Sequence, residues 1–293
     1  MGVVISDEKV FQEKIAGLRR AGSDQLHVIT DFDLTLTKSE YQGRKLPSLF
    51  ALIREGTYLT PDYPRKAFAL YDEYRPVETD ETISLEEKMR RMHEWWSRHL
   101  DIMIKSGMSR QVVYRIVHDH DGLFKDGAAA FFDRLHQRKV PLLIFSSGLG
   151  DLIKGFLAKA GLLYDNVDVI ANFYSFNEQG QVTGYQSKIV HSYNKSEVQL
   201  VATRHHEMMR QRQNVLLLGD SLGDPGMVEG VAHAIVLKIG YLHDERNLDA
   251  YKRLYDVVLV NDESLAYVND VLDTLFAHSA DPERGEKRSQ QGE

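Results

Sequence analysis

Three short apolar runs, each followed at once by small or acidic polar residues, constrain the fold of this chain more than any other feature. They are LHVIT at Leu26–Thr30, VPLLIF at Val140–Phe145 and NVLLL at Asn214–Leu218. Such runs are typical of buried strands, and helical patterns separate them, so they predict an α/β fold with a doubly wound, mainly parallel sheet. Ligands of these sheets bind beyond the carboxyl ends of the strands. The residues expected together at that edge are Asp31, Ser146 and Asp220.

The connection between the first and second runs is unusually long. More than a hundred residues separate Asp33 from Val140, which exceeds an ordinary loop. The stretch is rich in helical pattern, and we expect turn breaks at Pro61-Asp62 and Arg75-Pro76. We interpret residues 40–125 as an inserted helical cap domain, with residues 1–39 and 126–279 forming the core domain.

The rest of the chain gives weaker signals. Apolar residues at helical spacing predict a first helix over residues 8–20, which Ala21-Gly22-Ser23 would end. We expect strands at Val167–Ala171 and Tyr255–Val260, and a turn between paired strands at Asn177–Gly180. The tail from residue 280 to residue 293 has no apolar periodicity, so we expect it to be disordered.

Composition narrows the classes of partner. The net charge of -7 disfavours a nucleic acid polymer as partner, because tracking phosphates needs excess Lys and Arg. With no cysteine, thiolate metal sites and a cysteine nucleophile are excluded. No run is long enough to span a membrane and no signal-peptide pattern is present, so we expect a cytoplasmic monomer without membrane contact. Gly2 and Ser6 match the loose N-myristoylation pattern, which short sequences often match by chance.

Asp31 and Asp33 follow the first run directly. In an extended stretch, residues two apart project to the same side, so both carboxylates can reach one small site. One can attack phosphorus while the other protonates the leaving oxygen and later activates water. Acidic pairs near strand ends are also common caps and turn formers, so this pair alone does not establish catalysis.

Two further segments offer groups that bind phosphate. After the second run, Ser146 and Ser147 precede Gly148, and a hydroxyl with free backbone N–H groups can hold phosphate oxygens there. Lys195 lies in a polar stretch and can neutralise both a phosphate and an attacking carboxylate. Taken singly each signal is weak, since a lone lysine is usually a solvated surface charge.

The third run leads into the acidic sequence LLLGDSLGD, which contains Asp220 and Asp224. If these carboxylates converge with Asp31, they make a hard oxygen site suited to Mg2+. A cation matters because an anionic carboxylate cannot readily approach an anionic phosphate unless positive charge offsets the repulsion. The alternative for this segment alone is a calcium-binding or structural acidic loop.

In this order, the four elements resemble the haloacid-dehalogenase-like phosphohydrolase superfamily. The resemblance implies a nucleophile at Asp31, a general acid/base at Asp33 that also binds metal through its backbone carbonyl, phosphate binding by Ser146 and Lys195, a metal ligand at Asp220 and a supporting acid at Asp224. A closer resemblance, from about Phe11 to about Leu275, is to the cytosolic 5'-nucleotidase III family. It rests on the stretches ITDFDLTLT, FSSGLGD, ANF, NK, LLLGDSLGD, LKIGYL and DVVLVNDESL.

That family includes pyrimidine-preferring enzymes and 7-methylguanosine phosphate-specific enzymes. The resemblance implies a base pocket in the cap, with Phe50 and Trp96 at stacking positions and Glu78 facing the base. Two aromatic faces would suit a cationic methylated guanine, and Glu78 would accept from its N–H donors. Trp95 and Trp96 point about 100° apart on a helix, so we expect Trp95 to pack between cap helices, while His99 edges the pocket.

These residues could equally be core aromatics and a surface glutamate. Ser147 departs from the alanine usual in the family and could add a phosphate contact. We expect hydrolysis of 7-methylguanosine 5'-monophosphate, with CMP or UMP as secondary substrates. The alternatives are a pyrimidine-specific enzyme with nucleoside phosphotransferase activity and a non-catalytic nucleotide sensor.

Overall fold

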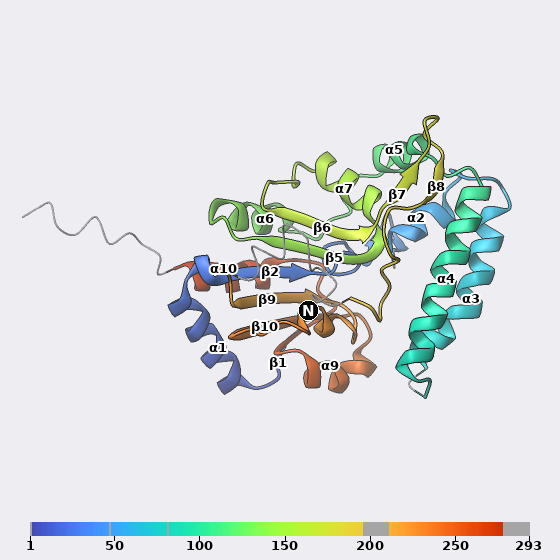
Figure 1. Cartoon of the computed structure of the whole chain (residues 1–293). Coiled ribbons are helices and arrows are strands. Elements are labelled where there is room, and N and C mark those ends of the chain that lie inside the picture. Colours follow the sequence, from blue (N-terminus) through green and yellow to red (C-terminus); the bar gives the residue numbers. More distant parts are fainter. Residues whose placement is uncertain (1, 47, 81, 196–210, 278–293) are drawn as a thin grey trace, which may run out of the picture.

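A seven-stranded sheet forms the centre of the molecule (Figure 1). The computed structural model describes residues 2–46, 48–80, 82–195 and 211–277. The strand order is β1-β11-β10-β9-β2-β5-β6, and every neighbouring pair is parallel except β1 with β11. The prediction of a mainly parallel α/β sheet is therefore confirmed.

The strands that lead to the predicted polar clusters lie side by side in the middle of this sheet. Its members are β1 (Gly2–Ile5), β2 (Leu26–Thr30), β5 (Leu142–Leu149), β6 (Val167–Asn172), β9 (Asn214–Gly219), β10 (Ile235–Leu242) and β11 (Val257–Val260). Two short hairpins stand outside it, formed by β3 (Glu40–Tyr41) with β4 (Arg44–Lys45) and by β7 (Tyr174–Phe176) with β8 (Val182–Tyr185). The turn predicted at Asn177–Gly180 joins β7 and β8, as expected.

Some predicted strand ends were wrong. The second run begins as a strand at Leu142 rather than Val140, because Pro141 has no N–H to donate and contributes only its carbonyl, which accepts from Val28 at 2.9 Å. The same strand continues to Leu149, so Ser146 lies within it. The last strand begins at Val257 instead of Tyr255. The strands β1 and β10 were not predicted.

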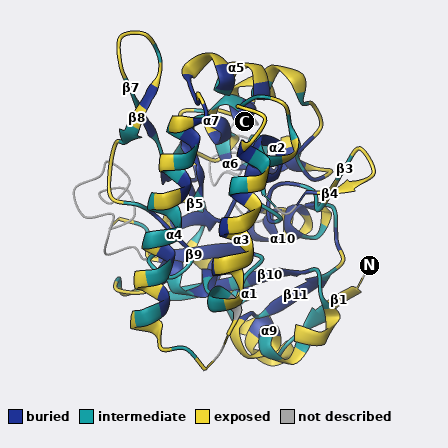
Figure 2. Cartoon of the chain, turned by 90° about the vertical axis from the view of Figure 1, so that its right-hand side faces the viewer, coloured by how far each residue is buried: buried dark blue, intermediate teal, exposed yellow. Residues whose placement is uncertain are grey.

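Helices of the core cover both faces of the sheet, and others project beyond it (Figure 1). They are α1 (Glu8–Ala21), α2 (Leu49–Glu55), α3 (Tyr63–Thr79), α4 (Leu85–Lys105), α5 (Arg110–Asp119), α6 (Ala128–Gln137), α7 (Gly150–Lys159), α9 (Leu248–Leu254) and α10 (Ala266–Phe276). Alternate residues of β9 serve different faces: Leu216 and Leu218 join the larger core with α1, α6, α7 and α10, whereas Val215 and Leu217 pack on the side of α9. Figure 2 shows the central strands as buried, whereas β1 at the edge of the sheet is partly exposed.

The first helix ends where the sequence predicts. Asp7 accepts a hydrogen bond from the Val10 N–H at 3.0 Å and so caps the start of α1. Gly22, with φ of 79°, follows its last residue, and that backbone conformation favours glycine.

The helices α3 and α4 pack against each other and stand beyond the carboxyl ends of the strands, whose arrowheads point toward them in Figure 1. The chain leaves the core and returns to it at neighbouring points, as the hydrogen bond from the Lys38 N–H to the Leu123 carbonyl at 2.9 Å shows. Helix α5 packs against α7 of the core. The part that projects from the core is thus mainly the α3–α4 pair, and the cap boundaries at 40 and 125 stay a proposal.

The turn break expected at Arg75-Pro76 is wrong, because Pro76 lies inside α3. An interior proline removes its own N–H and crowds the carbonyl four residues earlier, yet the helix runs three residues further, to Thr79, with the Asp80 N–H donating to the Pro76 carbonyl at 3.0 Å. Packing of Leu70 and Tyr74 against Met92 of α4 holds the helix through this position.

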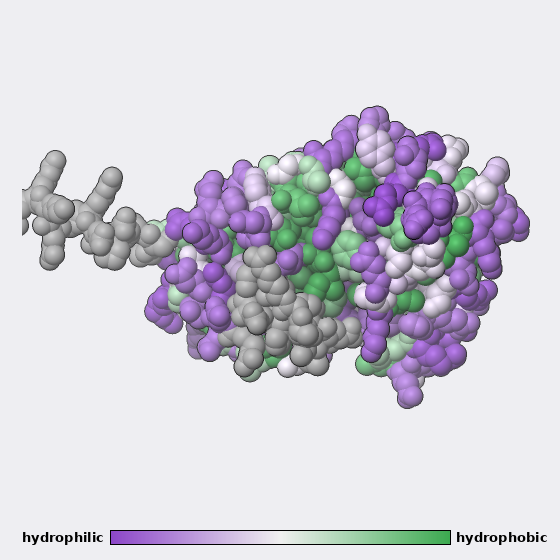
Figure 3. Space-filling view, turned by 45° about the horizontal axis from the view of Figure 1, so that its top comes forward, coloured by the Kyte–Doolittle hydropathy of each residue, from purple (hydrophilic) through white to green (hydrophobic). Residues whose placement is uncertain are grey.

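The tail at 280–293 lies outside the described residues. Among those described, no helix is both long and apolar enough to cross a bilayer. The face shown in Figure 3 is mostly hydrophilic, with hydrophobic atoms gathered near its middle.

Candidate active site

The two aspartates after β2 are anchored by different backbone groups. The Asp31 N–H donates to the Leu218 carbonyl of β9 at 3.0 Å, which fixes Asp31 beside the neighbouring strand end. The Asp33 carboxylate accepts the Leu49 N–H at the start of α2, also at 3.0 Å. Both side chains are held at the same rim of the sheet, and Asp31 is only 8% exposed.

Lys195 joins this rim from a segment far along the chain. Its Nζ lies 2.8 Å from an Asp31 oxygen and 3.2 Å from an Asp224 oxygen. Burial lowers the pKa of the Lys195 ammonium, but Asp224 and Asp31 outweigh that effect and keep it above its ordinary value. Burial raises the pKa of Asp31, and Lys195 partly offsets the increase. Lys195 therefore stays a cation inside a buried acidic site.

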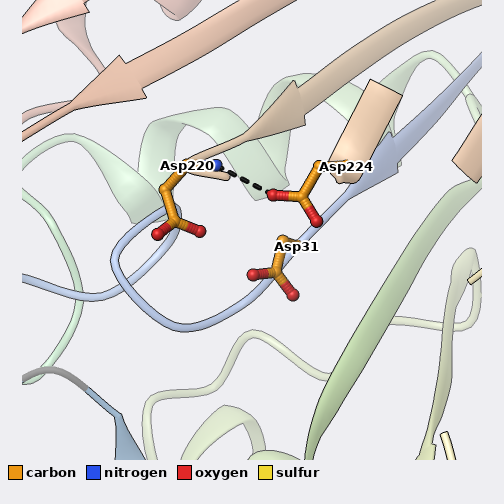
Figure 4. A group of neighbouring side chains, drawn as sticks. All are labelled: Asp31, Asp220 and Asp224. Carbon is orange, nitrogen blue, oxygen red and sulfur yellow. Dashed lines mark hydrogen bonds between the residues drawn. The ribbon is translucent and has the colours of Figure 1, made fainter. Parts of the chain in front are cut away.

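The loop after β9 brings two more carboxylates to the rim (Figure 4). Asp224 folds back on its own loop, and its Oδ2 accepts the N–H groups of Asp220 at 3.1 Å and Ser221 at 3.0 Å. Gly219 allows this close approach, since a Cβ at that position would lie 2.5 Å from the Asp224 Cβ. Asp224 thus orients the loop while Asp220 keeps its carboxylate for the site.

The residues present fit a hard divalent cation. Asp31, Asp220 and Asp224 each offer a carboxylate oxygen, and these oxygens all lie within 4.8 Å of one another. Burial, followed by the charges of Asp224 and Asp31, raises the pKa of Asp220 well above its ordinary value. The raised pKa shows that one ammonium does not balance the carboxylates gathered here, and a cation with oxygen ligands would offset their remaining repulsion.

Asp33 differs from its neighbours. Burial and the charge of Asp31 raise its pKa to about 7, against the opposing effect of the Leu49 N–H and Lys195. A carboxyl group with a pKa near neutrality can both donate and accept a proton under physiological conditions, as a general acid/base requires.

The segment after Phe145 lies against Asp33. The Gly148 N–H donates to Ser146 Oγ at 3.0 Å, and a Cβ at Gly148 would lie 3.5 Å from Asp33 Oδ2. Ser146 is buried at this place. Ser147 is half-buried, and its carbonyl accepts from the Asn172 side chain at 2.7 Å.

Two tyrosines at the rim were not anticipated from the sequence. The Tyr251 hydroxyl donates to the Asp220 carbonyl, and the Tyr255 hydroxyl donates to the Ser221 carbonyl, so both clamp the backbone of the acidic loop. They lie four residues apart, one helical turn, in α9 and at its C-cap. That spacing is the one sequence signal from which a shared partner could have been inferred.

The predicted aromatic residues meet beside α2. Phe50 follows Leu49, whose N–H binds Asp33, so the aromatic cluster adjoins the acidic rim. The Phe50 and Trp96 ring centroids lie 4.7 Å apart at 45°, and Phe50 lies 5.1 Å from His99. The His99 Nε2 lies 3.0 Å from the Tyr63 hydroxyl, and burial lowers the His99 pKa to about 4. The rings of Phe50 and Trp96 therefore touch, without a base-sized gap between them.

Trp95 and Glu78 have different surroundings. Trp95 stacks on Tyr74 at 5.8 Å within the small apolar cluster between α3 and α4, the position expected for a packing residue. The Glu78 carboxylate bonds Ser192 Oγ at 2.7 Å and Arg75 Nη1 at 2.5 Å. Glu78 thus lies between the helical pair and the segment that carries Lys195, and its carboxylate is engaged by protein groups.

The sheet, the inserted helices and the acidic rim define the class of protein, which has the haloacid-dehalogenase-like fold. The chain aligns with a phosphoserine phosphohydrolase-like protein from Francisella tularensis at a TM-score of 0.52 and 18% identity, covering 84% of this chain and 98% of that one. At that identity the likeness establishes the fold alone.

The chain belongs to the pyrimidine 5'-nucleotidase (UMPH-1) family, whose model matches residues 34–276. It is 34% identical to 7-methylguanosine phosphate-specific 5'-nucleotidase B of Xenopus laevis, over 94% of this chain and 96% of the relative. The Gallus gallus 7-methylguanosine phosphate-specific 5'-nucleotidase is 35% identical over 89% and 92%. A crystal structure of cytosolic 5'-nucleotidase IIIB bound to cytidine aligns at a TM-score of 0.83 with 29% identity, covering 93% of each chain.

Proposed function

We propose that this chain hydrolyses nucleoside 5'-monophosphates to nucleoside and phosphate, with Mg2+ as cofactor and 7-methylguanosine 5'-monophosphate as the preferred substrate. The observation that carries the proposal is the contact of Lys195 with Asp31 at 2.8 Å inside a buried acidic rim. This pairing keeps Asp31 oriented, and the ammonium offsets part of the charge of an approaching phosphate.

In the first step, an Asp31 oxygen attacks phosphorus and the bond from phosphorus to the 5'-oxygen breaks. The protonated Asp33 carboxyl gives its proton to that leaving oxygen, so the nucleoside departs as a neutral alcohol. In the second step, water attacks the phosphorus of the aspartyl-phosphate and transfers a proton to Asp33. The bond from phosphorus to Asp31 then breaks, which releases phosphate and restores both carboxyl groups.

The metal would be held by the carboxylates of Asp31 and Asp220 and by the Asp33 backbone carbonyl, with Asp224 holding the loop. When bound, a divalent cation offsets the repulsion between the anionic nucleophile and the anionic phosphate. Ser146 and Lys195 bind phosphate oxygens, and the half-buried Ser147 adds a hydroxyl at the same rim.

Base selection belongs to the aromatic cluster and Glu78. A cationic 7-methylguanine gains stacking and cation–π attraction from Trp96 and Phe50. Because these rings touch, a base enters between them only if Trp96, which is half-buried, turns aside. The Glu78 carboxylate gives up its hydrogen bond from the Ser192 hydroxyl and accepts hydrogen bonds from the N–H donors of guanine instead.

A panel of substrates tests this proposal. We expect 7-methyl-GMP to have the highest kcat/KM, CMP to follow, and EDTA to abolish phosphate release until Mg2+ is restored. Turnover of CMP with 7-methyl-GMP ignored would refute the stacking argument and favour the pyrimidine-specific alternative, which the likeness to the cytidine-bound structure supports. When a second nucleoside is added as acceptor, phosphotransferase activity is detected as formation of the monophosphate of that nucleoside.

A further inference from the structure

Tyr193 lies two residues before Lys195 but packs among the projecting helices. Its ring joins the apolar cluster between α3 and α4, with Tyr74 and Met92. The segment that supplies the phosphate-binding lysine therefore also supplies an aromatic side chain to the cap. This insertion ties one end of the active site to the other.

Polar contacts surround the inserted ring. The Tyr193 hydroxyl donates to the Glu78 carbonyl at the end of α3. Lys88, in the first turn of α4, donates to the same carbonyl at 3.2 Å and to the Tyr193 oxygen at 3.3 Å. Ser192 donates to the Glu78 carboxylate at 2.7 Å. We call Glu78, Lys88, Ser192 and Tyr193 the latch.

Lys88 shows that the latch is more than a surface contact. The residue is only 9% exposed, and its partners are a carbonyl, a phenol oxygen and the Tyr193 ring, whose centroid lies 5.2 Å away. A buried ammonium costs free energy unless polar groups compensate for the lost water. The Tyr193 segment supplies part of that compensation, so separating it from α4 leaves Lys88 under-bonded.

The latch segment is stiffened by its own hydrogen bonds. The Asn194 side chain bonds the His191 N–H at 2.7 Å and the Ile189 carbonyl at 2.8 Å. Gly223 of the acidic loop lies close behind, since a Cβ there would be 3.0 Å from the Ser192 carbonyl. These contacts anchor the Lys195 end to the core independently of the cap, so the Tyr193 contacts determine how far the Glu78 end lies from it.

We propose that Tyr193 and Lys88 are positioning residues that fix the distance between Glu78, at the base end, and Lys195, at the phosphate end. This inference rests on the proposed function, in which Glu78 faces the base. A nucleoside 5'-monophosphate must reach both ends at once, whereas a phosphate ester without a base uses the phosphate end alone. The latch thus selects substrates by the separation of their two recognised groups.

The kinetic test compares a nucleotide with phenyl phosphate in the variants Tyr193→Phe and Lys88→Met. Phenylalanine keeps the ring packing and removes only the hydroxyl. We expect kcat/KM for 7-methyl-GMP to fall about tenfold, mainly through a higher KM, as for the loss of one buried hydrogen bond. The kcat/KM for phenyl phosphate stays unchanged. Tyr114→Phe, at an exposed tyrosine of α5, is the matched control.

A second measurement does not depend on activity. Since the chain has no cysteine, spin labels can be placed at Glu86→Cys on α4 and Asp249→Cys on α9, both exposed. Pulsed electron paramagnetic resonance should give a narrow distance distribution that broadens in both latch variants but not in the control.

An equal loss for both substrates, no kinetic change, or an unchanged distance distribution would overturn the proposal. If the parent chain hydrolysed no nucleotide, the proposed function would fail, and the label distances would still decide whether the latch holds the cap.

Discussion

The acidic rim and the aromatic cluster lie side by side but are built differently. The rim is assembled from the ends of adjacent parallel strands, and its carboxylates are fixed by backbone N–H groups and one ammonium. The aromatic cluster brings together α2 and α4, and its rings are held by ring contacts and the bond of His99 to Tyr63.

This difference suggests a division of roles. Strand ends in a sheet cannot move independently, so the rim is suited to chemistry that requires fixed geometry. Trp96 is the half-buried ring of the cluster and can turn at lower cost than a buried one, so the cluster is suited to accommodating a base. Changes at the rim should therefore remove catalysis, and changes at the cluster should alter binding.

The largest expected effect is at the nucleophile. Asp31→Asn keeps the shape of the side chain but removes its charge, so turnover should fall on the order of 10⁴-fold or more. Nucleotide binding, measured by calorimetry, should be retained. Substantial activity in purified Asp31→Asn would break the distinction between the two regions.

Removing the rim cation should come next. Lys195→Met leaves Asp31 and Asp224 without their shared ammonium, and kcat should fall roughly 10²- to 10³-fold, as when a preorganised electrostatic group is lost. Lys188→Met, at an exposed lysine of the same segment, is the control and should retain the parent rate. Equal losses in the two variants would mean that location at the rim is irrelevant.

The buried histidine of the cluster should make stability depend on pH. The folded-state pKa of His99 is about 4, below its ordinary value of 6.5, so the unfolded chain binds the proton more readily. The stabilisation is therefore present above pH 6.5 and is lost as pH falls toward 4. From pH 7 to pH 5, the free energy of unfolding should fall about 2 kcal/mol more in the parent than in His99→Gln, as measured with urea. Parallel curves would show that His99 does not titrate in this way.

The smallest effect separates the two neighbouring tryptophans. Trp96→Ala should raise the KM for 7-methyl-GMP about tenfold and leave kcat nearly unchanged, because one stacking face is lost. Trp95→Ala removes the stack on Tyr74 and should lower the melting temperature without changing the KM. The reverse pattern would exchange the roles assigned to these residues.

Sequence reasoning predicted the central strands β2, β5 and β9 and the edge at which their polar residues meet, because apolar runs and parallel topology leave little choice. It could not predict contacts made across the chain. Tyr193 enters a cluster formed by α3 and α4 more than eighty residues earlier, and no local pattern indicates that partner. The helix through Pro76 was missed for a similar reason, since tertiary packing overrode a local signal.

The central claim is that phosphate becomes covalently attached to Asp31 during turnover. Mass spectrometry of the enzyme, acid-quenched during hydrolysis of a nucleoside monophosphate, tests it most directly. The account predicts a phosphoryl group on the peptide that contains Asp31, absent from Asp31→Asn. A labelled peptide elsewhere, or turnover with no phosphorylated enzyme in a quench fast enough to capture it, would contradict the account.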